Sequence, residues 1–143
     1  MLAVVRRVIP GLWAGMLCAV GYLAAPVLFA VLEDRATAGL LAGTMFTVAT
    51  VCSLALAAVL LAAWLRSAGA RRHRILALLA AGLLAANEWG LRPVMEAARL
   101  ADGTPGPGFG ALHGVSAVLW LLATGLVLWL AALGSPPVSG RAG

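Results

Sequence analysis

The residues best suited to chemistry stand in the third of four apolar runs, where charged side chains are unexpected. Glu88, Arg92 and Glu96 are spaced four apart, so they share one face of a helix. Glu88 before Arg92 is the favourable order for an ion pair one turn apart. Pro93 predicts a kink there, because proline removes a backbone hydrogen bond. A rise of about 1.5 Å per residue puts Glu88 roughly 20 Å into the run, in its outer third.

Two more polar residues are expected at the same depth. His113 opens the fourth run, and Asp34 follows the first run and is expected to cap it. Tyr22, Trp89 and Phe109 are expected to frame the group. We therefore predict a polar cluster of Glu88, Arg92, Glu96, His113 and Asp34 near one end of the runs.

The chemistry of this cluster is open to several interpretations. Charged residues within an apolar span are costly, so they usually face other helices and have partners. One interpretation is a hydrogen-bond network that fixes packing, and the other is a shallow site for a cation, a metal or a small polar ligand. His113, Met95 and Met45 are ligands that suit copper, whereas two-histidine haem binding is not expected with His73 in a distant linker. No catalytic residue is predicted: Ser116 follows His113 within one turn, but no third group is placed to orient the base.

The amino-acid composition indicates whether water or lipid surrounds the segments that carry these residues. The chain has 143 residues, enough for one domain, and 63% are hydrophobic while only 10% are charged. A small soluble domain keeps much of its area in water and could not cover so much apolar surface, so the lipid bilayer is the predicted environment. The net charge of +5 comes from ten arginines and no lysine. Most of them flank apolar runs and form no basic face, so no nucleic-acid binding is predicted.

Four apolar runs are long enough to cross a bilayer as helices. They cover residues of about 8–32, 37–65, 75–100 and 109–133. Because the connections are short, the predicted fold is all-α: one integral-membrane four-helix bundle over residues 1–143, antiparallel and up-and-down. Residues 134–143 are predicted to form a disordered tail.

The arginines predict the orientation of the bundle. Seven of them flank one side, in the N-terminal segment, in the linker after the second run and in the tail, whereas Arg35 and Arg99 flank the other. The positive-inside rule places the arginine-rich side in the cytoplasm. With four spans, both termini are predicted to be cytoplasmic (N-in/C-in).

Small residues are expected to pack the helices closely, because apolar helices in lipid gain little from hydrophobicity alone. Glycines four apart occur at Gly11 and Gly15, at Gly39 and Gly43, and at Gly110 and Gly114. Four short helices enclose little room, so a homo-oligomer or a larger membrane complex is an open alternative to a single copy. The two cysteines lie within apolar runs and predict no disulfide.

Several stretches together resemble a known family. They are residues 12–15 (LWAG), 21–30 (GYLAAPVLFA), 34–39 (DRATAG), 42–46 (AGTMF), 92–95 (RPVM) and 109–116 (FGALHGVS). Their order and spacing resemble the bacterial membrane proteins of domain-of-unknown-function family 4149 (DUF4149), which is similar to the transmembrane protein 205 group of eukaryotes.

The resemblance implies a four-helix protein of the bacterial inner membrane. It also implies a distant kinship with copper-resistance-type membrane domains, which contain more histidine than this chain does. The leading hypothesis is a non-enzymatic transport, binding or accessory membrane protein without a cofactor, centred on the polar cluster. The alternative is a copper- or redox-linked membrane protein that uses His113 with Met95 and Met45.

Overall fold

The computed structural model describes residues 2–65, 67–100 and 104–134, and most of them are helical. In chain order the elements are α1 (Leu2–Cys18), η1 (Ala19–Ala24), α2 (Ala25–Val31), α3 (Arg35–Trp64), η2 (Ala68–Ala70), α4 (Arg71–Ala85), η3 (Ala86–Leu91), α5 (Arg92–Ala97) and α6 (Phe109–Ala132). The described residues contain no strand, and only an isolated bridge joins Arg99 to Pro105. The predicted all-α, four-helix fold is confirmed.

Four continuous spans result, because α1, η1 and α2 follow one another without a break, as do α4, η3 and α5. They run over Ala3–Val31, Arg35–Trp64, Arg71–Ala97 and Phe109–Ala132, and all four are long and apolar enough to cross a membrane. The first helix begins at Leu2 and the third at Arg71, between one and two turns earlier than their apolar runs. Arginines in those turns continue the helix beyond the apolar stretch. Most of the predicted disordered tail lies outside the described residues.

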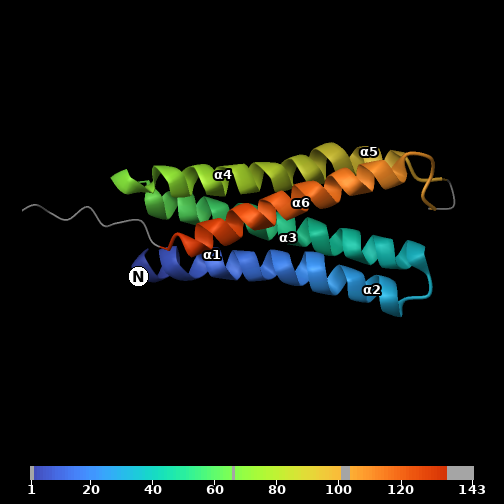
Figure 1. Ribbon diagram of the computed structural model, residues 1–143, viewed down its shortest axis with the longest axis horizontal. Coiled ribbons are helices and arrows are strands. Elements are labelled where there is room, and N and C mark those ends of the chain that lie inside the picture. The colour runs from blue at the N-terminus through green and yellow to red at the C-terminus, as the bar shows by residue number, and fades with distance from the viewer. Residues whose placement is uncertain (1, 66, 101–103, 135–143) are drawn as a thin grey trace, which may run out of the picture.

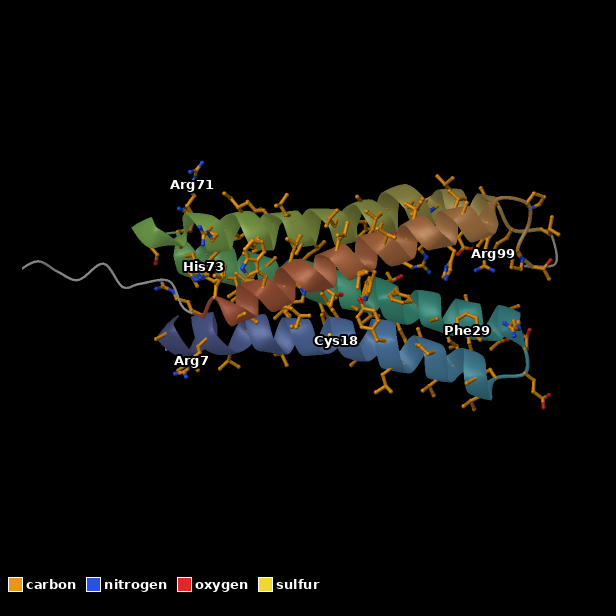
Figure 2. All side chains as sticks on the ribbon, in the orientation of Figure 1. Arg7, Cys18, Phe29, Arg71, His73 and Arg99 are labelled. Carbon is orange, nitrogen blue, oxygen red and sulfur yellow. The ribbon has the colours of Figure 1, made fainter. Side chains whose placement is uncertain are left out.

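The spans form an antiparallel bundle in which α1 and α4 each pack against both α3 and α6. Figure 1 shows that the N-terminus, the start of α4 and the end of α6 lie together at one end. We call this the core end. The turns from α2 to α3 and from α5 to α6 lie at the opposite end, which we call the cavity end. Figure 2 places Arg7, Arg71 and His73 at the core end, and Phe29 and Arg99 at the cavity end.

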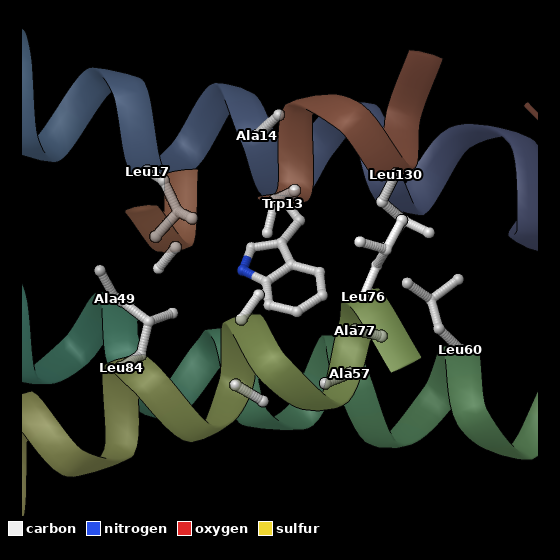
Figure 3. Close-up of a cluster of buried hydrophobic side chains, with 14 of the residues drawn as sticks. Trp13, Ala14, Leu17, Ala49, Ala57, Leu60, Leu76, Ala77, Leu84 and Leu130 are labelled. Atoms are coloured by element: carbon white, nitrogen blue, oxygen red, sulfur yellow. The ribbon is translucent and has the colours of Figure 1, made fainter. Parts of the chain in front are cut away.

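The core end is packed by large side chains that interlock across small ones (Figure 3). Trp13, Leu17, Leu60, Trp64 and Leu130 are completely buried. The small residues that let the helices approach are alanines, namely Ala49, Ala57, Ala77, Ala80 and Ala123. Close approach matters because van der Waals contact, rather than exclusion of water, holds helices together in lipid.

The predicted glycine seams are wrong for the first and fourth helices. A methyl group added at Gly11, Gly15, Gly110 or Gly114 would meet nothing within 4 Å, so these glycines face away from the rest of the described chain. Alanine fills the seam instead, because its methyl group still permits close approach while adding contact area. Cys18 and Cys52 are both free.

Two π-helical segments, η1 and η3, interrupt the first and third spans. The amide of Ala25 donates to the carbonyl of Val20, and that of Arg92 donates to Asn87, each five residues back. A proline follows each segment, Pro26 in α2 and Pro93 in α5. Proline cannot donate a hydrogen bond and crowds the preceding turn, and π segments often occur at functional sites. The distortion expected at Pro93 is therefore this wider turn, and it has an unexpected counterpart before Pro26.

Candidate ligand-binding cavity

A cavity of about 720 Å³ opens between the helices at the cavity end. Residues of η1, α2, α3, η3, α5 and α6 line it, together with the turns that join these spans. The two π-helical segments contribute Gly21, Tyr22, Asn87 and Glu88 to its wall. In this part of the bundle α2 packs against α3, and α5 packs against α6. The interruptions of the first and third spans therefore coincide with the level at which the bundle opens.

An ion pair anchored to α3 is the most buried polar feature of the cavity. Arg92 Nη1 lies 2.5 Å from Glu88 Oε1, and the same carboxylate oxygen accepts a hydrogen bond of 2.7 Å from the Thr47 hydroxyl. Arg92 Nη1 also contacts Thr47 Oγ1 and donates to the Gly43 carbonyl at 3.0 Å. Only 8% of Glu88 and 29% of Arg92 is exposed. The predicted pair therefore exists, and it links the third span to the second.

The guanidinium of Arg92 packs against Gly43 of α3. A Cβ atom at Gly43 would stand 2.9 Å from Arg92 Nη2, so the guanidinium lies against bare helix backbone. Gly43 and Thr47 are one turn apart and together receive the arginine. Thr47 was not predicted as part of the site, because the sequence does not reveal which face of α3 meets Arg92.

A second group of side chains lies at the mouth of the cavity. Arg99 Nε is 3.0 Å from Glu96 Oε2, and its guanidinium carbon is 4.7 Å from the centre of the Phe109 ring. The Phe109 ring stacks on His113 with a centroid separation of 6.1 Å. Glu96 is 54% exposed, so water screens this pair more than the inner one. A Cβ at Gly39 would lie 3.6 Å from Arg99 Nη2, in ordinary contact.

Asp34 also lines the cavity, but it caps α3 rather than the first span. Its carboxylate accepts hydrogen bonds from the amides of Ala36 at 3.0 Å and Thr37 at 3.1 Å, and it contacts the Thr37 hydroxyl. These are the bonds of a helix N-cap. The Thr37 hydroxyl and the two amides lower the pKa of Asp34 below its usual 3.8. The expected cap on the first span was wrong, because a residue just after a helix has no free amides to satisfy there.

Aromatic side chains form the inner wall of the cavity, and packing contacts hold them in place. Trp120 packs its indole against Gly21 of η1 and meets the Phe46 ring edge-to-face at a centroid distance of 4.6 Å. The buried indole nitrogen of Trp120 and the buried amide oxygen of Asn87 have no hydrogen-bond partner among the described residues. Both residues line the cavity.

The structure brings together most of the residues singled out from the sequence. Asp34, Glu88, Arg92, Glu96 and His113 all line this one cavity. Tyr22 and Phe109 are there as expected, whereas Trp89 is exposed and does not line it.

The structure places only two of the three residues of the copper hypothesis at the cavity. Met95 and His113 line the cavity but Met45 does not. Within the described ranges no three histidine, cysteine, aspartate or glutamate residues are grouped to hold a metal ion. His73 belongs to the buried face of α4 rather than to a linker, and its Nε2 lies 3.1 Å from the Gly134 carbonyl oxygen.

This arrangement suits binding of a molecule that is partly polar and partly apolar. Ligand sites are mainly apolar enclosures with a few placed polar groups, and their volumes are about 300–1,000 Å³. The cavity has such a volume, an aromatic inner wall and an ion pair in its side.

Comparison with known proteins gives a family. No curated protein and no solved structure matches the chain. The family model described as "Domain of unknown function (DUF4149)" matches residues 8–103, which is more than half of the 143 residues. The chain therefore belongs to the DUF4149 family.

Proposed function

We propose that this protein is a non-enzymatic, multi-pass protein of the bacterial inner membrane that binds a small ligand in its cavity. It acts as a small transport, binding or accessory protein. The observation that carries the proposal is the position of the Glu88–Arg92 pair, which lies in the wall of a cavity inside a bundle of four apolar helices. Charges at such a position are costly and usually serve a substrate, an ion or a partner group.

The arginines support an orientation with the core end in the cytoplasm. Arg6, Arg7, Arg71, Arg72 and Arg74 all belong to the helix ends at the core end. Arg35 and Arg99 flank the turns at the cavity end, and Arg99 is paired with Glu96. The positive-inside rule then places both termini in the cytoplasm and opens the cavity toward the outer face.

Packing alone is a weaker explanation of the polar residues. A network that only fixes helix packing would leave little space around it, because protein interiors are close-packed. Here the ion pair borders a cavity of about 720 Å³. The hydrogen bonds of Arg92 to α3 all start from Nη1, and both Glu88 and Arg92 line the cavity. The pair therefore ties two spans together and also presents polar atoms to the cavity.

A matched pair of cavity-filling variants tests the proposal. Ala117 lines the cavity, whereas Ala55 is exposed on α3 and does not line it. We expect native mass spectrometry of the protein, extracted in mild detergent, to show a bound small molecule on the wild type. The same mass should appear on Ala55→Phe and be lost from Ala117→Phe. Equal occupancy in both variants, or no bound molecule on the wild type, would contradict ligand binding in the cavity.

A further inference from the structure

The charged residues of the described chain that line the cavity cancel one another. Among these described residues three are basic and three are acidic, namely Arg35, Arg92, Arg99, Asp34, Glu88 and Glu96. Their formal charges sum to zero. A site for a simple anion or a simple cation usually carries an excess of the opposite charge, and the described part of this wall has none. Separated charges of both signs instead complement a ligand that itself carries both.

The inner ion pair leaves one acceptor and at least one donor for such a ligand. Within the described chain, the hydrogen bonds to Glu88 all end on Oε1, and those from Arg92 all start from Nη1. Glu88 Oε2 and Arg92 Nη2 thus have no protein partner there. An ammonium group is complementary to the first atom, and a phosphate or carboxylate oxygen is complementary to the second.

Part of the cavity wall is apolar. Tyr22, Pro26 and Phe29 line the cavity from η1 and α2, and Ala117 lines it from α6. Tyr22 and Phe29 are 48% and 41% exposed. These side chains offer an acyl chain an apolar surface within the cavity, of the kind that ligand sites commonly present.

From these observations we infer that the ligand is a zwitterionic amphiphile with a single apolar chain. Its headgroup carries an ammonium group beside Glu88 and a phosphate or carboxylate beside Arg92. The chain follows the apolar wall of η1 and α2. The volume suits a drug-sized molecule, which favours one chain over two. This inference rests on the proposed function and adds the chemical class of the ligand.

Competition among three amphiphiles of equal chain length tests the inference. The probes are lysophosphatidylethanolamine, which is zwitterionic, lysophosphatidic acid, which is anionic, and an alkyltrimethylammonium salt, which is cationic. They are offered together at equal concentration to the purified full-length protein, and native mass spectrometry reads the occupancy of each. We expect the zwitterion to exceed either of the others by about tenfold, because a headgroup that carries charge of one sign alone meets a like charge in the pair.

Two neutralising variants should change this preference in opposite directions. Glu88→Gln leaves the cavity with one excess positive charge and should favour the anionic probe. Arg92→Gln leaves one excess negative charge and should favour the cationic probe. Circular dichroism and size-exclusion chromatography check that each variant is folded. If either is not, the wild-type ranking and its loss in Ala117→Phe still decide the question.

Each outcome has a separate meaning. If the wild type binds the anionic or the cationic probe as well as it binds the zwitterion, the zwitterion assignment is overturned. It is also overturned if folded Glu88→Gln and Arg92→Gln keep the wild-type ranking. Cavity binding itself would survive that result provided that Ala117→Phe still lowers the occupancy of every probe. If neither Ala117→Phe nor Ala55→Phe lowers the occupancy of any probe, both the inference and the proposed function fail.

Discussion

The two ends of the bundle are built from the same four spans and yet differ in almost every property. At the core end, buried tryptophans and leucines pack with buried alanines. Two residues after Leu17 the first span becomes π-helical, and η3 interrupts the third span in the same way. From these segments onward the wall contains paired charges and encloses about 720 Å³.

The difference teaches that stability and binding are assigned to separate lengths of the same helices. In lipid, close contact holds helices together, so a bundle that must keep a cavity needs dense packing elsewhere. Here the dense packing lies at the core end, where the Arg6 side chain also donates to the Ala63 carbonyl at 3.0 Å. The cavity end relies instead on a few polar contacts between neighbouring helices.

The largest effect should come from a cavity made in the core end. Leu130 is fully buried, whereas Leu128 on the same helix is 49% exposed. We expect Leu130→Ala to lower the free energy of unfolding by about 3 kcal/mol, because contacts are lost and the gap does not close. Leu128→Ala should change it far less. Equilibrium unfolding in mixed detergent–SDS micelles measures both, and equal losses would contradict the assignment of dense packing to this end.

The next effect concerns the inner ion pair. We expect Arg92→Gln to cost about 2 kcal/mol, because Glu88 is then buried without its partner. Adding Glu88→Gln should recover part of this loss, since the unpaired charge is gone. Glu96→Gln at the more exposed mouth is the control and should cost less than about 1 kcal/mol. The same unfolding measurement applies, and a double variant as unstable as the sum of the single ones would show that the pair is not coupled.

A smaller effect is expected where the two regions meet. Gly21→Ala would place its methyl group against the Trp120 indole, with Cδ1 at 2.9 Å, and Phe46 holds that ring from another side. We expect a loss of about 1.5 kcal/mol from overpacking. Gly15→Ala, whose methyl group meets nothing within 4 Å, should be neutral or slightly stabilising because alanine favours helix. The reverse order would show that Trp120 does not pack on η1.

The smallest effect is a pH dependence at the cavity end. Hydrogen bonds to Thr37 and the α3 amides lower the pKa of Asp34 below 3.8. A lowered pKa means that the ionised cap stabilises the fold above about pH 3.8 and that this contribution fades as the pH falls through the lower folded value. Asp34→Asn keeps a capping side chain but should remove this part of the acid sensitivity. Thermal unfolding followed between pH 3 and 6 checks it, and identical pH profiles for both proteins would contradict the prediction.

The fold was predictable from the sequence because it depends on composition over long stretches. Apolar runs of spanning length leave only helices as an option in lipid, and short connections leave only antiparallel neighbours. Helix ends were less predictable, since arginines at Arg6 and Arg71 extend the helices beyond the apolar runs.

The candidate site was predictable only in part. The spacing of Glu88 and Arg92 indicated their ion pair, because both lie on one helix and the geometry is local. Thr47 and Gly43 complete the site from another helix, and the sequence does not reveal which faces meet. Met45 was predicted as a site residue, but it does not line the cavity. Its position along α3 could be judged from the sequence, whereas the direction of its side chain could not.

The claim of an outward-facing cavity above a closed core is tested most directly by the accessibility of cysteines introduced at two positions of α6. Ser116 lines the cavity, and Ala123, seven residues later, is fully buried in the core end. With Cys18 and Cys52 replaced by alanine, each position is changed to cysteine and treated from outside intact cells with a membrane-impermeant maleimide. We expect Ser116→Cys to react and Ala123→Cys to stay unlabelled until the protein is denatured. Equal labelling at the two positions, or labelling of Ser116→Cys only from the cytoplasmic side, would contradict an outward-facing cavity above a closed core.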